Sequence, residues 1–288
     1  MIRRLPSVGA IAQGLRTLYR AQRFYGMRGA MSLARTLLPS GGPRHERAID
    51  LGTGKLLLRP GTTDAANLRE VFFEGSYDLN KFKHSARAHA FYRRLLAAGK
   101  RPFILDCGAY IGLSTRYLAE VFPQADIVAV EPSLPNYRLL EKNVAGRSRI
   151  RALHAAVGRA GTTVKIDNPA HPKFVGFTVS ACPPSDPEAL QSLSVSDLLP
   201  NDGERVPFIV KLDVQGAERD VFASHDWLAR VPIVLIELHD WRYPWQGRSA
   251  NFLSAVAQHP VEVLLNGQNL AVFNRDILGA ELDAPAAP

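Results

Sequence analysis

Hydrophobic residues in this chain occur mainly in short runs that alternate with longer segments of helical periodicity. The runs lie at residues 103–107, 126–130, 150–157, 208–212 and 233–239. Helical patterns follow them at 112–121, 134–144, from 217, and near 251–258. Repeated strand–helix units predict an α/β protein with a mostly parallel sheet and helices on both faces.

The C-terminal part of the pattern changes character. Two apolar runs at 261–266 and 270–274 are separated only by Gly267, Gln268 and Asn269. So short a connection predicts a hairpin. One strand at the end of the sheet is therefore expected to run antiparallel to the rest.

Other segments lie outside this rhythm. Residues 47–59 predict two short strands around Gly52 and Gly54, and helices are expected near 63–74 and 86–98. Residues 158–207 hold seven prolines and predict a hairpin (162–166 with 177–180) and a helix near 195–199. We interpret 158–207 as an insertion over the sheet, where loops often carry specificity.

These patterns predict four regions. Residues 1–45 form a helical N-terminal arm, with the helix at 10–38. Residues 46–100 form a hairpin and helices that cap the main domain. Residues 101–275 form that domain, and residues 276–288 form a flexible tail.

The charge of the chain is concentrated in the arm. The formal net charge is +8, and residues 1–45 contain eight arginines, no lysine and no acidic residue. The main domain is therefore near neutral, which argues against a nucleic-acid-binding face spread over the protein. Two interpretations of the arm stay open: an amphipathic helix on an anionic membrane or acidic substrate, or a packed arm with its arginines in water.

The sequence favours a cytoplasmic location. A peripheral contact with a membrane, made by residues 1–45, stays open in addition. No stretch approaches 18 consecutive apolar residues, and the N-terminus has no apolar segment typical of a signal peptide. The two cysteines, Cys107 and Cys182, do not form a disulfide framework. Cys107 is expected to be a small buried residue and not a nucleophile.

A glycine loop follows the run at 103–107. The sequence DCGAYIG places Asp106 at the end of a strand, with Gly108 and Gly112 turning the chain into a helix. Glycine permits close approach of backbone to a ligand, and a helix N-terminus favours an anion. The order Asp-x-Gly-x-x-x-Gly is not the GxGxxG of dinucleotide-binding folds. It resembles the loop that holds the methionine part of S-adenosylmethionine.

The next strand ends in Glu131, whose carboxylate can accept bonds from both hydroxyls of a ribose. The alternative is that Asp106 and Glu131 only cap helices. Together, the loop and Glu131 predict a site for a nucleoside cofactor. Its candidate residues are Asp106, Gly108, Ala109, Tyr110, Gly112, Ser114, Thr115, Glu131, Pro132, Asn136, Ala155, Ala156 and Asp213.

A second polar cluster is predicted beside this loop. Asp213 follows the run at 208–212, and Glu237 and His239 alternate onto one face at the end of the run at 233–239. Ligands bind beyond the carboxyl ends of strands in open α/β sheets, so the three are expected to meet there. Glu218 falls in a first helical turn, where a negative charge is favoured for structural reasons alone. An internal hydrogen-bond network is the alternative role for the cluster.

These segments together resemble the FkbM family of S-adenosylmethionine-dependent methyltransferases. The motifs are DCGAYIG, KLDVQGAE and IELHDW, and the likeness extends over residues 47–275. It implies the class I methyltransferase fold, with a seven-stranded sheet. It also implies methyl transfer to a hydroxyl of a sugar, a glycolipid or a secondary metabolite.

In this interpretation His239 is the expected base, and Asp213 and Glu237 are its catalytic partners. We do not expect a metal at this site. The alternative is a divalent ion bound by Asp213, His239 and Asp240, with Glu237 as a further ligand. The loop at Trp241, Tyr243 and Trp245 suits stacking on a ring or forms a packed lid.

Two other functions stay open, as does a homo-oligomeric state. One is an RNA methyltransferase that uses the basic arm. The other is a non-catalytic module that binds the cofactor and docks to a membrane or partner.

Overall fold

The computed structural model describes residues 19, 27, 31, 46–168 and 177–279. The chain divides into two compact units, residues 1–75 and residues 76–288. The helix predicted at 10–38 lies outside the described residues apart from three isolated positions. Among the residues that are described, no helix is both long enough and apolar enough to cross a membrane.

The first unit contains the predicted hairpin. Strand β1 (Arg47–Asp50) pairs antiparallel with β2 (Lys55–Leu58), and helix α2 (Asp64–Leu68) continues into the π-helical turn η1 (Arg69–Glu74). Asp64 is buried and accepts hydrogen bonds from the backbone and guanidinium of Arg59. This ion pair ties the end of the hairpin to the start of the helix.

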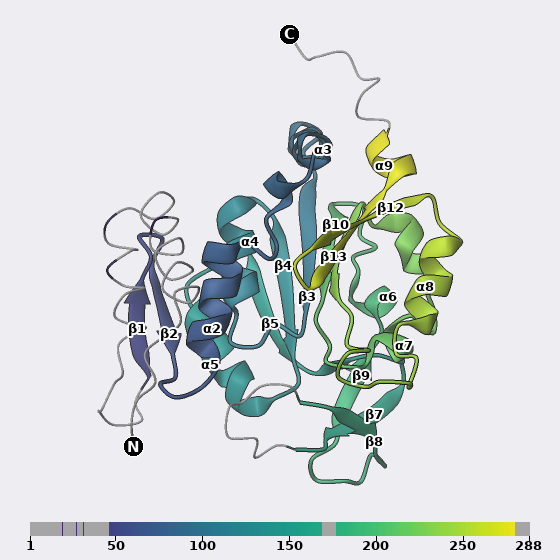
Figure 1. The fold of residues 1–288 in the computed structure, drawn as a ribbon. Coiled ribbons are helices and arrows are strands. Elements are labelled where there is room, and N and C mark those ends of the chain that lie inside the picture. The colour runs from purple at the N-terminus through teal and green to yellow at the C-terminus, as the bar shows by residue number, and fades with distance from the viewer. Residues whose placement is uncertain (1–18, 20–26, 28–30, 32–45, 169–176, 280–288) are drawn as a thin grey trace, which may run out of the picture. The chain divides into compact units, whose positions relative to one another are not determined.

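The second unit is built around a seven-stranded sheet with the order β12-β13-β11-β10-β3-β4-β5 (Figure 1). Its strands are β3 (Arg101–Cys107), β4 (Asp126–Glu131), β5 (Ile150–His154), β10 (Arg205–Leu212), β11 (Ile233–Glu237), β12 (Val261–Asn266) and β13 (Asn269–Asn274). Within this sheet β13 runs antiparallel to both neighbours, and every other adjacent pair is parallel. The predicted fold class and C-terminal hairpin are confirmed.

Helices cover both faces of this sheet, as repeated βα units require. One face packs against α6 (Val195–Leu198), α7 (Glu218–Val221), η3 (Asp226–Arg230) and α8 (Ala250–Ala257) in a core that includes Phe222, Trp227 and Phe252. The other face meets α3 (Ser85–Ala97), α4 (Leu113–Val121) and α5 (Leu134–Val144), and the short helix η2 (Leu79–Lys81) contacts α3. Parallel strands buried on both sides explain the near-continuous apolar runs of the sequence.

The insertion forms a small sheet of its own, with the order β6-β9-β7-β8. Its strands are β6 (Ala156–Val157), β7 (Thr162–Ile166), β8 (Val179–Ala181) and β9 (Leu190–Leu193). Because β6 begins two residues after β5 ends, this sheet starts at the carboxyl end of β5 (Figure 1). The predicted hairpin is β7 paired with β8, whereas the periodicity did not reveal β9.

Two sequence expectations differ from the observed secondary structure. The run at 150–157 is two strands, because the chain leaves the large sheet after His154 and β6 pairs with β9 instead. The tail predicted as flexible from residue 276 begins within helix α9 (Arg275–Gly279), where Asn274 accepts bonds from the first backbone N–H groups. Helix α3 lies in the same compact unit as the large sheet, residues 76–288.

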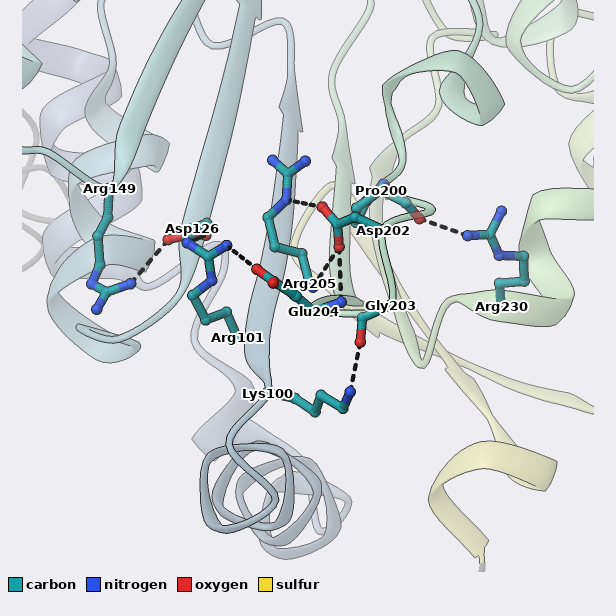
Figure 2. A network of polar contacts seen from close by, with 10 residues as sticks. All are labelled: Lys100, Arg101, Asp126, Arg149, Pro200, Asp202, Gly203, Glu204, Arg205 and Arg230. Atoms are coloured by element: carbon teal, nitrogen blue, oxygen red, sulfur yellow. Dashed lines mark hydrogen bonds and ion pairs between the residues drawn. The ribbon is translucent and has the colours of Figure 1, made fainter.

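The amino-terminal ends of the strands carry an exposed network of ion pairs (Figure 2). Arg101 bridges Asp126 and Glu204, and Arg149 binds the same aspartate. Exposed ion pairs of this kind contribute little stability, about 0–1 kcal/mol each. This edge ties β3, β4 and the loop before β10 together, at the end of the sheet opposite the predicted site.

Candidate active site

The loop after β3 is tightly constrained by its neighbours. Gly108, Tyr110 and Gly112 all have positive φ angles, of 73°, 54° and 85°. The Gly108 and Ala109 N–H groups both donate to the Val130 carbonyl on β4. A Cβ at Gly108 would lie 1.9 Å from the backbone oxygen of Asp213, so only glycine fits between β4 and the end of β10.

Asp106 supports this loop from inside. Its side chain is buried, and its Oδ2 accepts hydrogen bonds of 2.7 Å from the hydroxyls of both Ser114 and Thr115 at the start of α4. Its Oδ1 lies 3.2 Å from the ammonium of Lys211. The structure therefore brings these predicted residues together, with the hydroxyls directed at Asp106.

Lys211 lies in the motif KLDVQGAE but was not among the predicted site residues, and the structure places it directly beside the loop. Its buried ammonium donates to the Gly108 carbonyl at 2.7 Å and lies 5.6 Å from the centre of the Tyr77 ring. Burial by itself would lower the pKa of Lys211, but the charge of Asp106, helped by Tyr77 and Asp213, raises it above the usual value. The signal in the sequence was a lysine inside the apolar run IVKL. A buried charge without a partner is costly, so this lysine had to lie close to an opposite charge.

Glu131 ends β4 directly beside the loop. Its carboxylate accepts hydrogen bonds from the backbone N–H groups of Tyr110 and Ser133 and from the amide of Asn136. Burial raises the pKa of Glu131 to about 7, although these three bonds and Lys211 favour the charged form. These bonds hold the Glu131 carboxyl group at the edge of the loop, where its ionised form accepts hydrogen bonds.

The remaining predicted cofactor residues take supporting positions. Asn136 is buried on α5, and the Pro132 carbonyl bonds to the ring of His154. Ala155 and Ala156 are buried where the chain passes from β5 into β6. Cys107 is buried, and burial raises the pKa of its thiol, as expected of a packing residue.

His239 is held by a buried glutamate. Its ring is 1% exposed, Glu218 is fully buried, and the ring Nδ1 lies 2.7 Å from Glu218 Oε1. The same oxygen accepts from the Gly216 N–H. An ionised carboxylate oxygen only accepts hydrogen bonds, so Nδ1 carries a proton and donates it. Glu218 was expected to act only at its helix terminus, whereas its side chain orients the imidazole.

The other ring nitrogen faces two carboxylates. His239 Nε2 lies 3.6 Å from Asp213 Oδ1 and 3.8 Å from Glu237 Oε1. The structure thus brings the three predicted catalytic residues together at the carboxyl ends of β10 and β11. Asp240, which belongs to the alternative metal set, lies outside this cluster, and its Oδ1 accepts a bond from the Ser249 N–H.

The environment of His239 favours its protonated form. Burial is the largest single effect and lowers the pKa of the ring. The bond to Glu218 and the charges of Asp213, Glu218 and Glu237 outweigh it, so the pKa is raised from the usual value. The cluster is therefore a good proton acceptor.

The loop after β11 forms the rim of the cluster. Arg242 donates to the side chain of Gln215, which in turn donates to Asp213 Oδ1. Trp241 is 67% exposed, and its ring centre lies 6.2 Å from that of His239. Trp245 is fully exposed and has a positive φ of 66°. Two aromatic surfaces therefore face solvent on the loop that leaves the cluster.

Comparison with known proteins gives several similar chains. A segment of 68 residues, 23% of this chain, is 37% identical to the methyltransferase sdnD of Sordaria araneosa, and it spans only 26% of that relative. A putative caffeoyl-CoA O-methyltransferase from Staphylococcus aureus is 10% identical over 65% of this chain and 81% of its own, with a TM-score of 0.36. The N-terminal domain of human METTL16 is 12% identical over 66% and 69%, with a TM-score of 0.35.

A family model described as the methyltransferase FkbM domain matches residues 106–267, more than half of the chain. The match begins at Asp106 and includes Glu131, Asp213, Glu218 and His239. These residues lie at the carboxyl ends of the strands, where the class I methyltransferase sheet places its ligands. The chain belongs to the FkbM methyltransferase family, and its cofactor is S-adenosylmethionine.

Proposed function

We propose that this methyltransferase transfers a methyl group from S-adenosylmethionine to a hydroxyl of a small molecule, namely a sugar, a glycolipid or a secondary metabolite. The observation that carries the proposal is the buried Glu218–His239 pair, whose Nε2 faces the end of the sheet. A hydroxyl is a weak nucleophile until it loses its proton, so its methylation needs a proton acceptor. An imidazole held in one tautomer supplies it.

The residues after β3 and β4 fit the cofactor. Glu131 has about four lone-pair sites on its two oxygens, and the three N–H bonds leave it able to accept from a ribose hydroxyl. The glycine loop, Asp106 to Gly112, would hold the amino-acid end. Ser114 and Thr115 would act through Asp106 by fixing the loop. The cofactor supplies a methyl carbon bonded to a positively charged sulfur.

The cluster provides the proton acceptor for this reaction. As the acceptor oxygen bonds to the methyl carbon, the carbon–sulfur bond breaks and its electron pair stays on sulfur. The hydroxyl proton passes to His239 Nε2. Glu218 stabilises the resulting imidazolium through Nδ1, and the charges of Asp213 and Glu237 favour it further.

The rim supports a ring-shaped acceptor. Trp241 presents an exposed face next to His239, and Trp245 is exposed on the same loop. Aromatic side chains in water favour contacts with the apolar faces of sugars and other rings. An acceptor that stacks on Trp241 would bring its hydroxyls close to the imidazole.

The test supplies the full-length protein with ¹³C-methyl-labelled S-adenosylmethionine and a panel of hydroxylated sugars, glycolipids and phenols. Each compound is paired with a relative in which the hydroxyl is absent or blocked. We expect labelled methyl attached to oxygen, seen by NMR, with the hydroxylated member of a pair only. His239→Ala should reduce turnover by at least about 100-fold and leave the Kd of S-adenosylhomocysteine within about twofold.

The matched control is His259→Ala, because that histidine contacts the ring of His225 and lies between α8 and β12, outside the cluster. It should retain full activity. Label on nitrogen or carbon would contradict the proposal. So would full turnover by a folded His239→Ala protein.

A further inference from the structure

Three side chains converge at the ends of two neighbouring strands. Asp213 follows β10, Glu237 is the last residue of β11, and His239 lies two positions further. One ligand atom from each lies within 4.8 Å of the other two. This spacing follows from the parallel register, which pairs Leu212 with Ile236 and so aligns the two strand ends.

The imidazole nitrogen at the centre of this cluster lacks a hydrogen bond. His239 Nε2 is buried and, within the described part of the chain, no polar atom lies at hydrogen-bond distance from it. The nearest carboxylate oxygens, at 3.6 and 3.8 Å, are too distant for hydrogen bonds. A buried polar nitrogen without a partner is costly and rare. Its position between two carboxylates suggests that it has a partner which is not part of the protein.

We propose that Asp213, Glu237 and His239 bind one divalent first-row metal ion, with Nε2 as the nitrogen ligand. Ligand atoms about 2.0–2.1 Å from such an ion lie about 3.0–3.4 Å from one another. The distances of 3.6 and 3.8 Å from Nε2 to the two carboxylates, and the limit of 4.8 Å within which all three ligand atoms lie, are somewhat longer. Small side-chain movements of Asp213 and Glu237 would complete the site.

The surroundings of the cluster fit a metal site. A metal-bound histidine normally donates its other N–H to a carboxylate, which fixes the tautomer and the ring orientation. Glu218 does this for His239. Gln215 donates to Asp213 Oδ1 and orients the second ligand. The Glu218 contact gives the imidazole the tautomer that a metal ligand needs.

The ligand set also restricts the kind of ion. Two carboxylates suit hard ions such as Mg²⁺ and Mn²⁺, whereas an imidazole favours Mn²⁺ or Zn²⁺ over Mg²⁺ and Ca²⁺. Three protein ligands leave coordination positions open, as in catalytic sites. The role of the site rests on the hydroxyl methylation proposed above. With the ion bound, His239 Nε2 is a ligand and no longer accepts the hydroxyl proton; the ion would stabilise the negative charge on the acceptor oxygen, and the proton would leave to water.

Metal binding by the full-length protein tests this proposal. The protein is first treated with a chelator, and Mn²⁺ is then titrated while free Mn²⁺ is followed by its EPR signal. We expect one ion per chain, displaced by Zn²⁺ but not by an equal concentration of Mg²⁺. Asp213→Asn and Glu237→Gln should each weaken binding at least tenfold, and Glu218→Gln about 10–100-fold.

The control is Glu262→Gln. Glu262 lies on β12, outside the cluster, and its carboxylate pairs with His84. It should bind Mn²⁺ as the parent does. No stoichiometric binding by folded protein, or binding unchanged in Asp213→Asn and Glu237→Gln, would overturn the site.

The outcome is separable from that of the proposed function. Hydroxyl methylation by chelator-treated protein that binds no Mn²⁺ would overturn the metal site and leave the function intact. One Mn²⁺ per chain that is lost in both variants would support the site, even if no hydroxyl acceptor were methylated.

Discussion

Glu218 and His239 form a hydrogen-bonded pair inside the protein, with 2.7 Å between Oε1 and Nδ1 and both side chains buried. Glu218 lies at the start of α7, and His239 lies just beyond β11, 21 residues later. The pair fixes which ring nitrogen points at Asp213 and Glu237. Whether Nε2 serves as base or as ligand, its availability depends on Glu218.

Removing the carboxylate of Glu218 should allow the neutral His239 ring to exchange between its two tautomers. In Glu218→Ala, Nδ1 and the Gly216 N–H both lose their acceptor, so the ring will redistribute its proton between the two nitrogens. Ring ¹⁵N NMR at alkaline pH should show the Nδ1-protonated form in the parent and a mixture in the variant. Glu218→Gln, which keeps an acceptor oxygen, should lie between them. Identical spectra for all three proteins would refute the positioning role.

Lys211 and Asp106 should depend on each other for stability. Lys211→Met leaves the buried carboxylate without its counter-charge and is expected to lower the free energy of unfolding by about 3–5 kcal/mol. Asp106→Asn keeps an acceptor for Ser114 and Thr115 but leaves the lysine unpaired. The double variant should be less destabilised than the sum of the two. Urea unfolding of all four proteins measures the coupling, and additive effects within about 0.5 kcal/mol would contradict the pair.

Gly108 and Gly146 allow a matched comparison, because both have positive φ, of 73° and 77°. Alanine at Gly146 meets nothing within 4 Å and should cost about 1 kcal/mol for backbone strain alone. Alanine at Gly108 has the same strain and also collides with the Asp213 carbonyl, so it should cost about 1–3 kcal/mol more. Unfolding by urea and titration with S-adenosylhomocysteine test both variants. Binding should weaken only in Gly108→Ala, and equal effects would be evidence against the close approach.

Glu131 should make the free energy of unfolding decrease as the pH rises. Its pKa is about 7 in the folded protein, against 4.5 for an unperturbed glutamate, so between these values the folded state keeps a proton that the unfolded state releases. Its contribution to the free energy of unfolding is therefore fully present below about pH 4.5 and is lost as pH rises toward 7. Glu131→Gln should flatten this part of the pH–stability curve measured by urea unfolding. A slope that persists in the variant would assign the effect to other groups.

Cofactor binding should show the opposite trend. A ribose hydroxyl donates best to an ionised carboxylate, so the affinity for S-adenosylhomocysteine should rise by up to about tenfold from about pH 6 to about pH 8. Calorimetric titration at several pH values measures the change. If the affinity does not depend on pH, either Glu131 is already ionised throughout this pH range or it does not bind the ribose. Glu131→Ala distinguishes the two cases, because it should raise the Kd only in the first.

Much of the fold follows from local sequence pattern. Short apolar runs placed most strands of the large sheet, and period-3.6 hydrophobicity placed most of its helices, because burial of an element depends on the spacing of apolar residues along it. Alternation along the run at 233–239 also put Glu237 and His239 on one side. The short strand β9 and the helix at Arg275–Gly279 were missed, since a four-residue strand and a five-residue helix carry too few positions to show a period.

The sequence by itself determined the class of fold, the family and the residues at the strand ends. Only the tertiary structure decided the pairings: Lys211 with Asp106, Glu218 with His239, and Gly108 against Asp213. Each pair joins residues from different βα units, and which strands become neighbours is set by the order of the whole sheet. Partners far apart along the chain therefore appear only when β3, β10 and β11 pack side by side.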